Sequence, residues 1–146
     1  MSRAWLFLGL VLVAGCGGGP ERAPASAVSA PSAAVDVGAI KPFILEKDGA
    51  FQALIDVAPV WAQVEARGDA AARKAAVFDA VAQVIKRDGA PKFPQAKEFQ
   101  VKVVRVTEYD SYNRPMFATG KPLCDGKFNL AQPAAAALVW TEANLQ

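Results

Sequence analysis

The stretch EFQVKVVRV, residues 98–106, decides the fold class of the second half of this chain. Phe99, Val101 and Val103 alternate with polar residues, which is the two-residue period of a β-strand with one buried face. Val104 and Val106 then take the opposite phase. We therefore predict a strand that either carries apolar residues on both faces or contains a β-bulge near Val103.

The sequence after this strand indicates further short strands in an antiparallel arrangement. Residues 109–115 supply a turn, and residues 116–119 return the chain beside the first strand. Asp125-Gly126 is flanked by apolar residues, and this dipeptide is favoured in two-residue hairpin turns. The run AAAALVW, residues 134–140, fits either a strand or a short helix.

The part of the chain before Pro91 is predicted to be helical. Apolar residues recur at spacings of three and four over residues 51–62 and again over 77–85, as on one face of a helix. Because only residues 67–69 separate the two runs, we expect an antiparallel helical hairpin. Pro59 lacks a backbone donor and predicts a kink or a split near Ala58 in the first helix.

Residues that are typical of helix ends support these helix limits. Asp48 and Asp69 stand where N-caps are needed, and Gly68 and Gly89 stand where helices commonly end. The segment KPFILEK, residues 41–47, is ambiguous, and the position of its proline favours helix. The sequence therefore predicts a single α+β domain over residues 38–146, with an N-terminal helical hairpin followed by a small antiparallel β-sheet.

The N-terminus has the layout of a secretory signal peptide over residues 1–15. Arg3 precedes the apolar segment 4–13, and small residues follow it. Ten residues form roughly 15 Å of helix, about half the thickness of a bilayer core, so the segment is a poor permanent membrane span.

The sequence Val13-Ala14-Gly15-Cys16 resembles the lipobox of bacterial lipoproteins, a likeness confined to this end of the chain. It implies that Cys16 becomes the first residue after cleavage and is lipidated with acyl chains such as palmitate, which together hold a protein stably on a membrane. The alternative is an ordinary signal peptide with a chance cysteine at its boundary. In this family an Asp after the cysteine commonly holds the protein at the inner membrane, so Gly17 implies the outer membrane, facing the periplasm.

A tether is predicted between the lipidated cysteine and the domain, over residues 16–37. Of the 21 residues from 17 to 37, fifteen are Gly, Ala, Pro or Ser. Such a composition buries too little apolar surface to offset the entropy of ordering, so we expect this segment to be disordered.

Composition excludes several functional classes. The chain contains no histidine, which removes the Ser-His-Asp and Cys-His catalytic systems and the common zinc sites. We therefore expect no metal, no cofactor and no catalytic residue. Removal of residues 1–15 leaves 15 basic and 14 acidic residues, and the scattered, nearly balanced charge argues against nucleic-acid binding.

Two further side-chain groups have a chemical and a plain interpretation. Cys124 is the second of two cysteines, and it is a buried inert thiol, a partner in a disulfide to another chain or a reactive catalytic thiol. Glu108 and Asp110 would lie about 6.6 Å apart on one face of a strand, a spacing that suits a carboxylate hydrolase. Their predicted turn is exposed, however, and solvent would leave both carboxyl groups unperturbed.

The most distinctive surface is predicted around residues 109–114. Two tyrosines next to Asn and Arg combine flat contact area with directional donors, a mixture enriched in protein interfaces. The candidate partner-binding residues are Tyr109, Asp110, Tyr112, Asn113 and Arg114. The alternative is a polar hairpin loop whose tyrosines cover the edge of the sheet.

These features together predict a noncatalytic, lipid-anchored envelope lipoprotein whose domain binds or positions another envelope component. A second hypothesis is a module that binds the peptidoglycan cell wall or inhibits an enzyme. The third is a cell-wall hydrolase that uses Glu108 and Asp110.

Overall fold

The computed structural model describes residues 33–146. The predicted signal peptide, residues 1–15, the predicted lipidation site Cys16 and tether residues 17–32 all lie outside the described residues. Within residues 33–146, none of the helices has the length and apolar character needed to cross a membrane.

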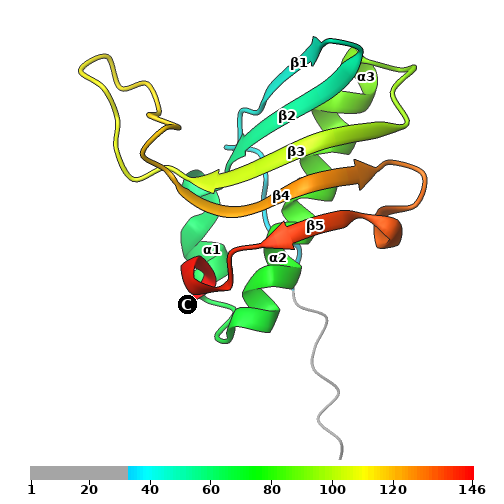
Figure 1. Ribbon diagram of the computed structural model, residues 1–146. Helices are drawn as coiled ribbons and strands as arrows, with labels where there is room; N and C mark the ends of the chain where they lie inside the picture. The colour runs from blue at the N-terminus through cyan, green and yellow to red at the C-terminus, as the bar shows by residue number, and fades with distance from the viewer. Residues whose placement is uncertain (1–32) are drawn as a thin grey trace, which may run out of the picture. The chain divides into compact units, whose positions relative to one another are not determined.

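The domain is built on one mixed sheet of five strands in the order β1-β2-β3-β4-β5 (Figure 1). The central neighbours β2 and β3 run parallel, and the other three pairs are antiparallel. The strands are β1 (Phe43–Lys47), β2 (Ala50–Asp56), β3 (Glu98–Arg105), β4 (Lys121–Asn129) and β5 (Ala137–Trp140).

The helices lie together between β2 and β3 in the sequence. They comprise the 3₁₀ turn η1 (Ala58–Val60), α1 (Trp61–Glu65), α2 (Ala70–Val84), the π-helical turn η2 (Ile85–Gly89) and α3 (Ala90–Lys92). Two more 3₁₀ turns, η3 (Pro133–Ala135) and η4 (Glu142–Leu145), flank β5. A helical connection of this kind is what joins two parallel strands of one sheet.

The predicted N-terminal helical hairpin followed by an antiparallel sheet is wrong. Two strands precede the helices, and the sheet is mixed. Residues 51–56, read as the start of a helix, belong to β2. Ala53 and Ile55 are buried on its core side, while Leu54 is half-buried on the other. Apolar residues on both faces of a strand also produce spacings of three and four, so the period alone could not separate strand from helix.

The first hairpin turn lies at Asp48-Gly49. Both residues have positive φ, 52° and 76°, which is the conformation of a type I′ turn and joins β1 to β2. Asp48 is therefore a turn residue and not a helix cap. The Asp125-Gly126 dipeptide, predicted to be a turn, lies inside β4.

Other local predictions divide between confirmed and wrong. The register of β3 against β4 shifts between Val103 and Val104, which confirms the bulge. Asp69 caps α2 as predicted, since its side chain accepts from the backbone N–H of Ala72 at 2.7 Å. The helix that was predicted to end at Gly89 continues to Lys92.

The break predicted near Ala58 is present, but it separates a strand from a helix. Pro59 lies in η1, between the end of β2 and the start of α1. Residues 43–47 form an edge strand rather than a helix. The C-terminal run resolves to a strand over 137–140 after a short turn.

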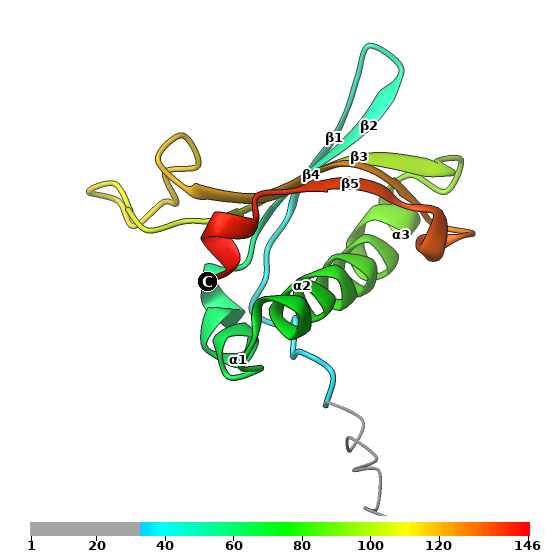
Figure 2. The ribbon, with the colours of Figure 1, turned by 60° about the horizontal axis from the view of Figure 1, so that its bottom comes forward.

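The helices cover one face of the sheet and leave the other face open (Figure 2). The hydrophobic core lies between these two layers. Its largest fully buried side chains include Phe99, Phe128, Ile40, Ile55, Ile85, Leu123 and Leu145. Trp61 belongs to this core and Trp140 packs against it.

The chain segment before β1 is fastened to the helical layer. Val35 and Val37 are buried in the core. Arg87 donates from its two terminal nitrogens to the carbonyls of Val37 and Ile40, each at 2.7 Å, and Arg67 donates to the carbonyl of Ala33. Residues 33–37, assigned to the tether from composition, are thus packed against the domain.

Candidate functional site

A long loop, residues 106–120, connects β3 to β4 and projects from one end of the sheet (yellow in Figure 1). We call it the projecting loop. It contains all five residues that the sequence predicted for partner binding. Its two ends continue from β3 and β4, which give it a rigid support.

The base of the projecting loop is held by a buried carboxylate. Asp56, at the end of β2, is 8% exposed. Its Oδ1 accepts from the backbone N–H of Val106 at 3.0 Å and from that of Ala58 at 2.8 Å. Beside it, the guanidinium of Arg105 lies over the ring of Trp61, 4.4 Å from the ring centroid. The start of the loop is thereby tied to both layers of the domain.

The middle of the loop folds back on itself as a miniature hairpin. The N–H of Met116 donates to the carbonyl of Glu108 at 3.0 Å, and Tyr109 and Pro115 form a bridge. Further out, the N–H of Asp110 donates to the carbonyl of Arg114 at 3.0 Å. These bonds bring the two arms of the loop together.

Asp110 organises the tip of this hairpin. Its Oδ1 accepts from the backbone N–H groups of Tyr112 at 2.9 Å and Arg114 at 2.8 Å, and its Oδ2 accepts from Arg114 Nε at 2.7 Å. The backbone N–H of Arg114 is the main cause that lowers the pKa of Asp110, with the Arg114 side chain and the Tyr112 N–H adding to it. Asn113 adopts a positive φ of 58° at the turn, a conformation that Asn tolerates better than most residues. The Asp110 carboxylate therefore stabilises the loop from within, and both of its oxygens accept hydrogen bonds from loop residues.

The remaining predicted residues are presented to solvent. Tyr112 is 79% exposed and Tyr109 is 48% exposed. The guanidinium of Arg114 lies over the Tyr112 ring, 5.2 Å from its centroid, and its side chain is 73% exposed. The loop therefore displays an aromatic–cation pair on a backbone that is already folded. The structure places the predicted residues together on one loop and places Asp110 beneath the others, an arrangement that the sequence could not show.

Within the carboxylate pair of the hydrolase hypothesis, Asp110 is poorly suited to act as the general acid. A general acid must hold its proton near the working pH, which requires a raised pKa. The pKa of Asp110 is lowered, and its oxygens bind the loop backbone and Arg114. The structure gives this residue a structural role.

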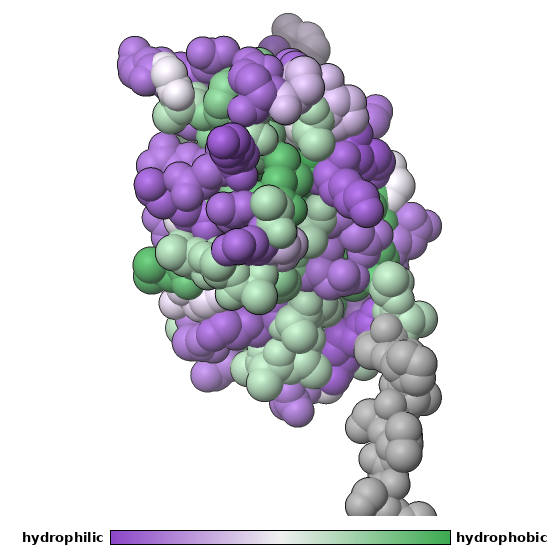
Figure 3. All heavy atoms as spheres, turned by 90° about the vertical axis from the view of Figure 1, so that its right-hand side faces the viewer, coloured by the Kyte–Doolittle hydropathy of each residue, from purple (hydrophilic) through white to green (hydrophobic). Residues whose placement is uncertain are grey.

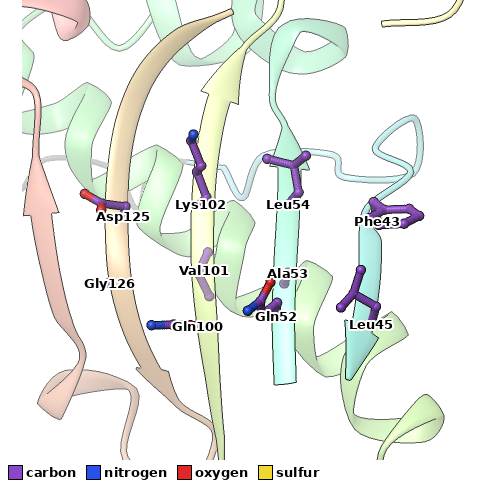
Figure 4. Close-up of a pocket in the computed structure, with 10 residues that line it drawn as sticks. All are labelled: Phe43, Leu45, Gln52, Ala53, Leu54, Gln100, Val101, Lys102, Asp125 and Gly126. Carbon is purple, nitrogen blue, oxygen red and sulfur yellow. The ribbon is translucent and has the colours of Figure 1, made fainter. Parts of the chain in front are cut away.

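A shallow groove of about 410 Å³ lies on the open face of the sheet and was not predicted from the sequence (Figure 4). Its apolar side is formed by Phe43, Leu45 and Leu54, and its polar side by Lys102 and Asp125 on neighbouring strands. Sequence reasoning missed it because residues 41–47 and 51–56 were read as helices. The sequence signal for this groove is the set of apolar residues that face outward on the two short strands around Asp48-Gly49, namely Phe43, Leu45 and Leu54.

The side of the molecule away from the projecting loop carries another hollow, of about 350 Å³, which is lined by residues that include Phe51, Glu98 and Lys127. There, hydrophobic atoms form narrow bands between hydrophilic side chains (Figure 3). Across residues 33–146 the exposed large hydrophobic side chains are Phe43, Tyr109, Tyr112, Met116 and Val139.

Cys124 lies in β4 with its side chain in the core, 2% exposed. Burial, helped by the charge of Asp125, raises the pKa of its thiol to about 12. A disulfide to another chain needs an accessible thiolate, so this environment suits the inert-thiol interpretation. Across residues 33–146 no three His, Cys, Asp or Glu side chains are grouped to hold a metal ion.

No protein-family model, curated protein or solved structure matches this chain. The functional argument therefore depends on the chain's own residues. Among the described residues, the projecting loop combines exposed recognition side chains with an internally bonded backbone, and it is the strongest candidate site.

Proposed function

We propose that the protein is a noncatalytic envelope lipoprotein, lipidated at Cys16, that binds another envelope protein through the projecting loop. In this proposal residues 1–15 are removed, and the domain faces the periplasm from the outer membrane. The observation that carries the binding role is the Tyr112–Arg114 pair, held in place by Asp110.

Two physical arguments support a protein partner. Tyrosine and arginine are enriched among the residues that dominate interface energies, because they offer a large contact area and directional hydrogen bonds. A loop already closed by its own hydrogen bonds loses little conformational entropy when it binds. The projecting loop meets both conditions through Tyr112, Arg114 and the bonds around Asp110.

The anchor is tested by fractionation and mass spectrometry of the full chain. We expect the mature N-terminus at Cys16 to carry acyl chains and the protein to fractionate with membranes. The variant Cys16→Ser should lose both properties, whereas Cys124→Ser should keep both. An unmodified thiol at Cys16 in the wild-type chain would contradict the anchor.

The binding surface is tested by photo-crosslinking in cells. A photoreactive amino acid at Ser111, next to Tyr112, should give an adduct of one discrete mass. Tyr112→Ala should abolish this adduct while leaving the backbone bonds of the loop intact, since Tyr112 contributes only its N–H to them. The matched control Phe43→Ala removes another exposed aromatic, 59% exposed and outside the loop, and should leave the adduct unchanged.

Two results would count against the binding role. An adduct that survives Tyr112→Ala would mean that the loop is not the recognition surface. Recovery of peptidoglycan fragments in place of a protein would favour the cell-wall hypothesis.

A further inference from the structure

The two edges of the sheet are unequally protected against pairing with another strand. On the outer side of β1, Lys92 donates from Nζ to the carbonyl of Ile44 at 2.6 Å, and Lys41, Glu46 and Lys47 add charge along the edge. Charged side chains and occupied carbonyls are common means of blocking an edge strand. Residues 128–141, which include β5, contain no charged residue; the charge near this strand is that of Lys74, whose Nζ lies 5.2 Å from the centroid of the Trp140 ring.

The hydrogen-bond pattern of β5 shows which of its backbone groups face outward. The N–H of Thr141 donates to the carbonyl of Leu123 at 2.8 Å, and the strand register continues this pairing through Val139 opposite Asp125. Because bonded and non-bonded pairs alternate in an antiparallel ladder, Leu138 and Trp140 direct their N–H and C=O groups away from β4. These outward groups are two residues apart, with Val139 between them.

We propose that β5 pairs with β5 of a second copy of this chain, antiparallel about a two-fold axis through Val139. In this register Leu138 of each copy lies opposite Trp140 of the other. Both residues direct their backbone groups outward, so the two pairs exchange four hydrogen bonds. The two sheets then join into one, with the helices of both copies on the same side.

The same register also covers exposed apolar surface without opposing like charges. Val139 is 70% exposed on the open face, and at the two-fold axis it meets Val139 of the second copy. Residues 137–141, which would face each other across the junction, are uncharged. A two-fold axis brings the same strand of each copy together, so a charge close to the axis would face the same charge on the other copy. An uncharged strand avoids this repulsion.

The pairing is short, because η3 and η4 bracket β5 and leave a ladder of four residues. Such a contact is weak between molecules free in solution. Confinement to a membrane surface raises the effective concentration of the partner strand, and this contribution, unlike the register, rests on the proposed lipid anchor.

Disulfide trapping in the full chain tests the register. In a non-bonded antiparallel pair the Cα atoms lie about 4.5 Å apart, within the range that a disulfide spans. With copper phenanthroline as oxidant, we expect Val139→Cys to give a covalent dimer at least about tenfold faster than Phe43→Cys, a control of similar exposure. Equal rates for these two variants would indicate random collision and overturn the proposal.

A mixed pair makes the test specific to this register. Ala137→Cys and Thr141→Cys should each fail to crosslink alone, because each lies far from its own counterpart, yet crosslink when the two variants are co-expressed. Adding Val139→Lys to both should abolish this crosslink by placing two positive charges at the axis, and combining Val139→Lys with Val139→Glu should restore it. Failure of the mixed pair to crosslink would overturn the inference.

Different results would contradict the lipid anchor and the strand pairing. If Cys16→Ser releases the protein from membranes, crosslinking should slow while the same residue pairs still react. If Cys16 proves to be unmodified, the pattern of reactive pairs in the purified full chain at high concentration still decides the strand pairing.

Discussion

Asp56 and Val106 lie fifty residues apart and are joined by a buried hydrogen bond of 3.0 Å from the Val106 N–H to the Asp56 carboxylate. This bond links the end of the second strand to the start of the projecting loop. It explains how a fifteen-residue connection leaves the sheet in a defined direction.

Replacement of Asp56 by Ala should destabilise the domain by roughly 1–3 kcal/mol, because the buried N–H of Val106 then has no acceptor. Asp56→Asn keeps a side-chain oxygen in place and should cost less. Denaturant unfolding of both variants, followed by circular dichroism, measures the difference. Equal losses in the two variants would show that charge, rather than the acceptor, is what matters.

Acid should disorder the projecting loop before it unfolds the domain. The folded pKa of Asp110 is lowered from its ordinary value of 3.8, so the ionised carboxylate stabilises the folded loop. This contribution is present above pH 3.8 and is lost as the pH falls through the lowered pKa. Amide exchange at Asn113 and Met116, measured by NMR against pH, should accelerate there, and Asp110→Ala should show fast exchange at all pH values.

Gly126 should tolerate substitution far less well than Gly49. A Cβ added at Gly126 would lie 2.0 Å from the carbonyl oxygen of Ala137, and its φ of +141° is itself unfavourable for other residues. We expect Gly126→Ala to cost roughly 2–5 kcal/mol and to loosen β5. Gly49→Ala has φ +76° but open space around it, and should cost about 1–2 kcal/mol. Thermal melts of the two variants compare these costs directly.

Cys124 should make the domain sensitive to alkali. Its folded pKa is raised from an ordinary 9.0 to about 12, so the folded state favours the neutral thiol. The resulting stabilisation is complete below pH 9 and is lost as the pH rises toward 12. Cys124→Ala should remove this additional alkaline loss in pH-dependent unfolding curves. In the wild-type chain, a thiol reagent at pH 8 should react only after denaturant is added.

The sequence predicted features that depend on neighbouring residues better than features that depend on distant ones. The bulge near Val103 and the cap at Asp69 follow from local pattern, and the structure confirms both. The identity of β2 depends on its pairing with β1 and β3, which lie on either side of it in the sheet. Because β2 has apolar residues on both faces, its own sequence does not show that it pairs with other strands.

The three Asp-Gly dipeptides illustrate the same limit. One forms a type I′ turn at Asp48, one lies in a π-helical turn at Asp88, and one lies within β4 at Asp125. Each local sequence permits a turn. Gly89 is needed instead because a side chain there would crowd the ring of Phe99, 3.1 Å from the added Cβ. Long-range packing therefore decided which dipeptide became the hairpin.

The candidate loop residues were identified from composition alone, since Tyr, Asn and Arg are informative wherever they are exposed. The role of Asp110 beneath Tyr112 and Arg114 follows from geometry that no spacing rule contains. The groove on the open face was missed for a related reason. Part of its lining belongs to β1 and β2, which the spacing of apolar residues had predicted to be helices.

The attachment of residues 33–40 to the helical layer determines how the domain would respond to mechanical tension. A pull transmitted along the preceding chain reaches Ala33 first, where Arg67 holds the main chain, and then the two carbonyls held by Arg87. These side-chain contacts bear the load before β1 does. The sheet would therefore carry tension only after these hydrogen bonds have broken and Val35 and Val37 have left the core.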